Sequence, residues 1–103
     1  MSELPKAFKK FIDEYPKVAE AYEKLGTEAH AAGPLDEKTR TLIKLSIAIG
    51  GRMEGAVHSH THKALDAGCT KEEIKQTVLL SLTTIGLPSM MAAMTWVNDI
   101  LEA

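Results

Sequence analysis

Three of the four histidines in this chain lie close together, at positions 58, 60 and 62, and Glu54 precedes His58 by about one helical turn. Residues four apart lie about 40° from each other around an α-helix, and residues two apart lie about 200° apart. A helix through this segment places Glu54, His58 and His62 on one face and directs His60 to nearly the opposite face. Imidazole transfers protons near neutral pH and is a common metal ligand. The segment therefore predicts acid/base chemistry or metal binding.

The face formed by Glu54, His58 and His62 leaves three interpretations open. A hydrogen bond that His58 donates to the Glu54 carboxylate would fix the imidazole tautomer and favour acid/base chemistry. Two histidines four residues apart on a helix could instead bind a divalent metal ion, with Glu54 as a further ligand. The same three residues also fit a solvated helix face without chemistry.

His60 and Arg52 are the other candidate site residues. His60 shares its side of the helix with small and apolar residues, so we expect it to be partly buried and hydrogen-bonded. It is either a structural histidine or a general acid or base. Arg52 follows Gly50-Gly51 just before the helix, where exposed amides favour anions. Its guanidinium suits carboxylates, so Arg52 is predicted to bind an acidic substrate, with a plain surface turn as the alternative.

The elements that position these residues are predicted to be helices almost throughout. Apolar residues recur at spacings of three and four, and proline, glycine and capping residues mark the ends. The fold class is therefore all-α, with about six helices in a single domain over residues 1–103. The predicted helices are Leu4–Tyr15, Pro16–Ala31, one capped by Asp36 and ending at Gly50-Gly51, one from Met53 or Glu54 to Gly68, one capped by Thr70 and ending at Gly86-Leu87-Pro88, and one from there to the C-terminus.

Composition excludes several classes of partner. The net charge of -2 and the lack of a basic patch argue against nucleic acid. No apolar run approaches the roughly 20 residues of a membrane span, and the N-terminus lacks the apolar core of a signal peptide. With Cys69 as its one cysteine, the chain cannot form an internal disulfide, which fits a cytoplasmic location. Surplus apolar residues in the last two predicted helices predict a homo-oligomer.

Several segments together resemble the carboxymuconolactone decarboxylase family, which includes the alkylhydroperoxidase D-like proteins. The similar segments are Gly33-Pro34-Leu35-Asp36-Glu37-Lys38-Thr39-Arg40, the apolar helix through Ile49, and His60 followed by Lys63-Ala64-Leu65-Asp66-Ala67-Gly68-Cys69-Thr70-Lys71-Glu72-Glu73-Ile74. The resemblance covers about residues 30 to 100. It implies an all-helical domain that forms trimers, hexamers or other rings. It also implies a small-molecule pocket that involves the histidine-bearing helix.

The peroxidase branch of that family uses a glutamate and a Cys-x-x-Cys-x-x-x-His motif. Here Met53 and Ala56 occupy the cysteine positions and Thr41 the glutamate position, so only His60 matches. Without two thiols there is no disulfide cycle to reduce a hydroperoxide. Dithiol peroxidase activity is therefore not expected, and a peroxidase that uses Cys69 alone is the weakest alternative.

The decarboxylase branch lacks the cysteine pair and removes carbon dioxide from an unsaturated carboxy-lactone. Such chemistry needs an anion site and a group that delivers a proton to carbon. The resemblance thus implies a lyase-like enzyme with His60 as proton donor and His58 and Arg52 near the substrate. No cofactor is expected, unless a divalent metal binds Glu54, His58 and His62. A metal-binding protein and a non-catalytic ligand-binding scaffold are the rival predictions.

Overall fold

The computed structural model describes residues 5–103, which form seven helices and no strand. Leu4, where the first helix was expected to begin, lies outside the described residues. The helices are α1 (Lys6–Glu14), α2 (Pro16–Ala31), α3 (Glu37–Gly50), α4 (Glu54–Asp66), α5 (Lys71–Leu80), α6 (Leu82–Ile85) and α7 (Leu87–Leu101). The predicted all-α class is confirmed. None of these helices is long and apolar enough to cross a bilayer.

Contacts within the chain separate two units, which meet in sequence at Leu35 and Asp36. The single domain predicted over residues 1–103 therefore stays a prediction. In the first unit, Pro16 occupies the first turn of α2, where its missing amide hydrogen leaves no helical bond unmade. Phe8, Phe11 and Tyr15 form successive ring contacts with centroids 6.2 and 6.1 Å apart. No residue of α1 or α2 is buried.

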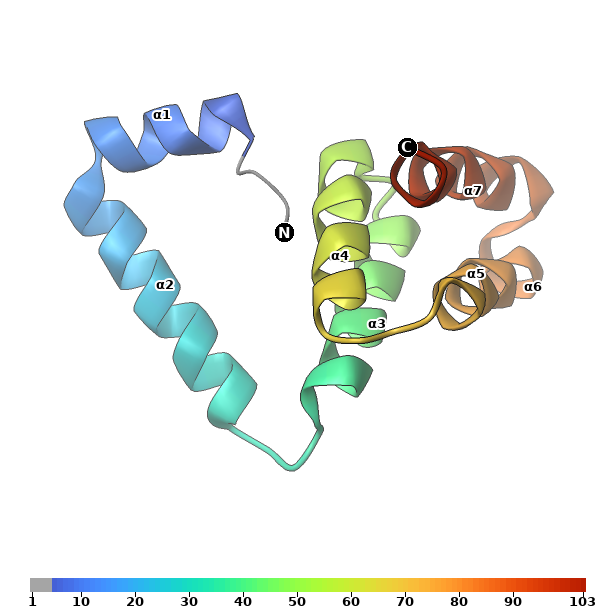
Figure 1. Cartoon of the computed structure of the whole chain (residues 1–103), viewed down its shortest axis with the longest axis horizontal. Coiled ribbons are helices and arrows are strands. Elements are labelled where there is room, and N and C mark those ends of the chain that lie inside the picture. The colour runs from blue at the N-terminus through green and yellow to red at the C-terminus, as the bar shows by residue number, and fades with distance from the viewer. Residues whose placement is uncertain (1–4) are drawn as a thin grey trace. The chain divides into compact units, whose positions relative to one another are not determined.

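The second unit contains the hydrophobic core. Helix α3 packs against α4 and α5, and α7 packs against α4, α5 and α6, as the right-hand part of Figure 1 shows. The buried residues come from four of these helices and from the turn before α5: Leu45, Ala48, Ile49, Val57, Thr61, Ala64, Cys69, Ile74, Val78, Met90, Ala93, Val97 and Leu101. Every candidate residue of the histidine segment lies on α4, so this core fixes the segment in place.

The ends of α4 and α5 follow from their capping residues. The Gly68 amide donates to Leu65 O and the Cys69 amide to Ala64 O. This pair of hydrogen bonds is typical of a Schellman motif. Gly68 has φ +93, a conformation that glycine adopts without penalty. Thr70 and Glu73 then form a reciprocal capping box at the start of α5, as predicted.

One predicted helix is interrupted. The expected helix from Thr70 to Gly86 breaks at Ser81 into α5 and the single-turn α6. The Ser81 hydroxyl donates to Val78 O at 2.7 Å and its amide bonds to the same oxygen at 3.0 Å. This local bonding competes with the regular helical pattern. Gly86, with φ 92 and ψ 164, then redirects the chain into α7.

Candidate functional site

Helix α4 presents its histidines to two different neighbours. His58 faces α7, where its Nε2 lies 2.9 Å from Asp99 Oδ2. His60 lies on the side of α4 toward α3, where Lys44 contributes to its electrostatic surroundings. Val57 and Thr61 are fully buried between these two sides. The helical period therefore separates His58 from His60, and the two imidazoles have different chemistry available to them.

The donor group on the α7 side consists of Glu54, His58 and Asp99. Their ligand atoms all lie within 4.8 Å of one another, and within the described part of the chain they are the group that could hold a metal ion. His62, which the sequence placed with Glu54 and His58, does not belong to this group. Asp99 takes its place because α7 packs against α4 beside His58. The sequence around α4 contains no signal for a partner that lies 41 residues further along the chain.

His60 lies in a half-buried environment that disfavours its charged form. Burial first, and then the nearby cations of Lys63 and Lys44, together lower the pKa of His60 from 6.5 to about 4. The imidazole is therefore neutral at pH 7 while no ligand is bound. In that state it can accept a proton or form a hydrogen bond, but it does not begin as an imidazolium acid.

The cations beside His60 form a group that joins α3 and α4. Burial lowers the pKa of Lys44, with Lys63 and then Arg40 as the next causes. The like charges of Lys44 and Lys63 together raise the local positive potential on this side of α4. A carboxylate that approaches this side of α4 would therefore be attracted. Neither Lys44 nor Lys63 was predicted as a site residue, because a lysine on a helix is usually only a solvated side chain.

Arg52 connects α3 to α4 through an unusual backbone conformation. Its φ is 55, in the left-handed region that non-glycine residues rarely adopt. The amides of Arg52 and Met53 bond to Ile49 O and Ala48 O, so they are not open to an anion. The guanidinium donates from Nε to Ser89 Oγ at 3.1 Å and from Nη1 to Gly50 O at 3.4 Å. The predicted substrate-binding arginine thus lies at the α4–α7 end of the second unit.

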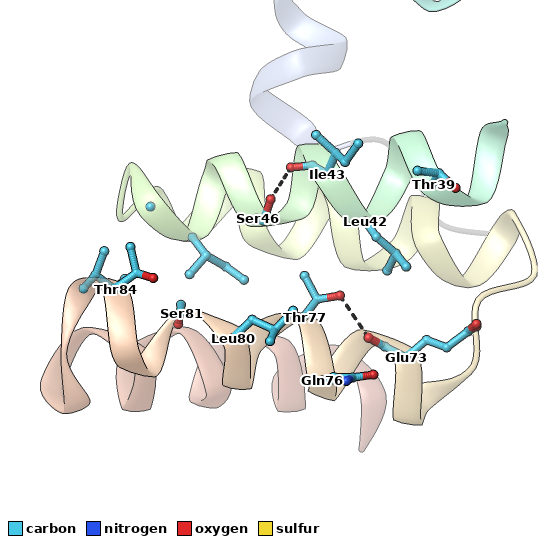
Figure 2. A pocket seen from close by; sticks show the side chains of 13 residues that line it. Thr39, Leu42, Ile43, Ser46, Glu73, Gln76, Thr77, Leu80, Ser81 and Thr84 are labelled. Atoms are coloured by element: carbon cyan, nitrogen blue, oxygen red, sulfur yellow. Dashed lines mark hydrogen bonds between the residues drawn. The ribbon is translucent and has the colours of Figure 1, made fainter. Parts of the chain in front are cut away.

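A pocket of about 660 Å³ lies on the side of α3 that faces α5 and α6 (Figure 2). Aliphatic side chains and hydroxyls line most of it, together with Glu73 and Gln76, and none of the predicted site residues is among them. The hydroxyls of Ser46 and Thr77 donate to Ile43 O and Glu73 O, which leaves their oxygen lone pairs available to accept. Thr77, Ser81 and Thr84 follow one another at spacings of four and three. This helical spacing could have identified the hydroxyl-bearing face from the sequence.

Comparison with known proteins identifies the family. The model of the carboxymuconolactone decarboxylase family matches residues 16–99, which is most of the chain. The chain belongs to the carboxymuconolactone decarboxylase family. A crystal structure of the apo form of a carboxymuconolactone decarboxylase family protein from Legionella pneumophila has the same fold. Its TM-score is 0.80 at 27% identity, and the match covers 93% of this chain and 86% of that one.

Two curated relatives are similar in sequence, and both are uncharacterised proteins. One, from Haemophilus influenzae, is 38% identical over 63 residues, which is 61% of this chain and 56% of the relative. The chain thus spans little more than half of that relative's length. The other, from Methanocaldococcus jannaschii, is 31% identical over 83 residues, 80% of each chain. These relatives support the family and do not assign an activity.

The single thiol of this carboxymuconolactone decarboxylase family member is enclosed by the fold. Cys69 is 5% exposed, and its Sγ lies 3.6 Å from Thr41 Oγ1 and 3.8 Å from Lys38 O. Reactive cysteines are partly exposed and lie in positive surroundings. The buried position of Cys69 therefore gives no support to a peroxidase that uses this thiol alone.

Proposed function

We propose that this chain is an enzyme that performs acid/base chemistry on a small organic acid or lactone, with His60 as the group that transfers the proton. Membership of the carboxymuconolactone decarboxylase family supports this proposal. The observation that carries it is the position of His60, half-buried on α4 with Lys44 and Lys63 close enough to act on its charge. Such a combination of imidazole and cations suits a negatively charged substrate.

Substrate binding would prepare His60 for its role. A carboxylate held by Lys44 and Lys63 offsets the positive charge that disfavours the imidazolium. The pKa of His60 then rises from about 4 toward neutrality, where proton transfer is most efficient. The imidazole would become protonated only while an anionic substrate is bound, and this coupling would restrict proton delivery to the occupied site.

The reaction that fits these groups is loss of carbon dioxide from a carboxylated lactone. The bond between a ring carbon and its carboxylate breaks, carbon dioxide leaves, and the electron pair passes into the unsaturated lactone. The imidazolium of His60 then gives its proton to carbon, and the neutral ring takes up a proton from solvent when the next anionic substrate binds. No redox partner is needed, which is consistent with a fold that contains one buried thiol.

The other two predicted residues contribute less to this proposal. His58 faces α7 and contacts Asp99, so the proposal uses His60 and not His58 for proton transfer. Arg52 already donates to Ser89 and Gly50. The proposal therefore assigns the substrate carboxylate to Lys44 and Lys63, with Arg52 as a structural link between α3 and α7.

The test replaces His60 with glutamine and follows turnover of a panel of carboxylated lactones. The variant should lose about 100- to 10,000-fold in kcat, the usual contribution of a general acid or base. His62→Gln is the matched control, because it removes an imidazole from another side of α4, and it should remain within twofold of wild type. If wild type converts no member of the panel, or if both variants are equally active, the proposal fails.

Ligand binding without catalysis is a second candidate, and the pocket between α3 and α5 supports it. This pocket contains Thr77 and Leu80 but not His60, so it would bind an apolar ligand independently of acid/base chemistry. Titration with the dye 8-anilinonaphthalene sulfonate tests it. Thr77→Trp should abolish dye binding, while Thr95→Trp, on exposed surface of α7, should not. Equal dye binding by all three proteins would exclude this pocket.

We also propose that the protein forms a trimer or hexamer, because several large apolar side chains remain exposed. On α2, Val18, Tyr22 and Leu25 are 56%, 63% and 66% exposed, and in the second unit Ile47 and Leu80 are 63% and 66% exposed. Apolar surface of this kind is usually covered by another copy. Light scattering on a size-exclusion column measures the mass. Leu80→Lys should lower the mass and Lys75→Glu should not, whereas a monomeric wild type would refute the proposal.

A further inference from the structure

Three oxygen and nitrogen donors converge on the α7 side of α4. Glu54 and His58 are four residues apart on α4, and Asp99 comes from the last turns of α7. Their ligand atoms all lie within 4.8 Å of one another, and His58 Nε2 is 2.9 Å from Asp99 Oδ2. Two of these groups are carboxylates, and a cation between them would offset their mutual repulsion.

The backbone that carries these donors is held by the core. Val57 and Thr61 of α4 and Val97 of α7 are fully buried, and the two helices pack directly against each other. The helix positions are therefore fixed, and only side-chain rotation remains free at Glu54 and Asp99. A site built on packed helices needs little rearrangement to bind an ion.

We propose that Glu54, His58 and Asp99 bind a divalent transition-metal ion, with Zn²⁺ as the preferred ion. Zn²⁺ bonds to imidazole nitrogen and carboxylate oxygen at about 2.0–2.2 Å, so the ligands of one ion lie roughly 3–3.5 Å apart. The observed limit of 4.8 Å exceeds that separation by about 1.3–1.8 Å. Changes of side-chain rotamer are enough to close the difference.

The donor set determines the class of ion. One imidazole and two carboxylates, without a thiolate, favour Mn²⁺, Fe²⁺ and Zn²⁺ over Cu⁺, and among these three divalent ions affinity rises from Mn²⁺ to Zn²⁺. With the imidazole neutral, as ligation requires, the two carboxylates carry a charge of -2 that a divalent ion balances. Three protein ligands would leave a coordination position for water.

This site is separate from the proposed catalytic imidazole. His58 faces α7, whereas His60 lies about 200° away around α4, toward Lys44 and α3. The metal site also differs from the set predicted from the sequence, which relied on His62 from the same helix. That difference provides a direct test, because the two ligand sets share Glu54 and His58 and differ only in Asp99 and His62.

Isothermal titration of untagged protein with ZnCl₂ measures the stoichiometry and affinity. Wild type should bind one Zn²⁺ per chain. Asp99→Asn, which keeps the shape of the side chain, should weaken binding at least tenfold, and Glu54→Gln should do the same. His62→Gln should stay within twofold of wild type, as should Asp66→Asn, a matched charge removal at the end of α4.

Two results would overturn the proposal. One is a wild type that takes up no Zn²⁺ in stoichiometric amount. The other is a protein in which His62→Gln weakens binding and Asp99→Asn does not, since the two histidines His58 and His62 of one helix would then account for the metal. Circular dichroism of each variant checks that the helices remain folded. Asp99 is 49% exposed, so its replacement should not disturb the core.

Discussion

Arg52 occupies a backbone position that glycine would occupy at lower cost. The amide of Met53 bonds to Ala48 O and that of Arg52 to Ile49 O, so α3 ends in a Schellman motif with Arg52 at its left-handed residue. The equivalent residue at the end of α4 is Gly68. Replacement of Arg52 by glycine should therefore give a more stable folded protein than replacement by alanine.

The expected difference in stability between Arg52→Gly and Arg52→Ala follows from three contributions to the free energy of unfolding. An L-residue in the left-handed helical region costs roughly 1–2 kcal/mol, and glycine returns about 0.5–1 kcal/mol of this through the greater freedom of its unfolded chain. Both variants lose the exposed bond from Arg52 to Ser89, worth about 0.5–1.5 kcal/mol at most. That loss cancels when Arg52→Gly is compared with Arg52→Ala. The glycine variant should exceed the alanine variant by about 0.5–1 kcal/mol.

Urea unfolding followed by circular dichroism measures this difference, provided that each variant is studied at the same oligomeric state and protein concentration. In thermal unfolding the difference corresponds to about 4–8 °C per kcal/mol for a domain of this size. Equal stability of the two variants, or a less stable glycine variant, would show that Arg52 is not held in the left-handed region. Ser89→Ala, measured in parallel, gives the contribution of the side-chain bond alone.

Three further predictions test the site and the core. His60 has a folded pKa of about 4 against an ordinary 6.5, so the unfolded chain binds its proton first; stability conferred by neutral His60 is present above pH 6.5 and is lost as pH falls toward 4. Allowing for partial exposure, the unfolding free energy of wild type should fall by about 1–2 kcal/mol more than that of His60→Gln over that range. Equal losses for the two proteins between pH 7.5 and pH 4.5, measured by urea unfolding, would contradict this. Thr70→Ala removes the bond to the Glu73 amide at 3.0 Å and should cost about 1 kcal/mol, whereas the same change at exposed Thr95 should cost less. Ile74→Ala removes a fully buried side chain and should cost about 2–5 kcal/mol in urea unfolding; a loss below 1 kcal/mol would mean that α5 does not close the core.

The helices were predictable because their signals are local. Pro16, Asp36 and Thr70 each mark a helix start through their own backbone or side chain, and Gly68 marks an end. The break at Ser81 was not predicted. A serine that bonds to the preceding turn gives a weak signal inside an otherwise apolar helix, and the competition between the two bonding patterns is decided by packing.

The site was predictable only as far as a single helix determines it. The helical period separated His60 from Glu54 and His58, and the structure keeps that separation. The partners of these residues come from elsewhere: Asp99 from α7 and Lys44 from α3. A sequence without its fold does not show which of the many acidic and basic residues fill these roles. The sequence therefore grouped His62 with Glu54 and His58 and gave no sign of Asp99.

The three candidate sites of the second unit face different neighbours, and this arrangement has a measurable consequence. His60 lies between α4 and α3, Asp99 reaches His58 on the α7 side, and the pocket lies between α3 and α5. Changes at sites without shared partners usually add in free energy. If the changes in activation free energy caused by His60→Gln and Asp99→Asn add up in the double variant, the metal site serves another purpose than proton transfer. A strong departure from additivity would instead show that the ion and the imidazole act on one substrate across α4.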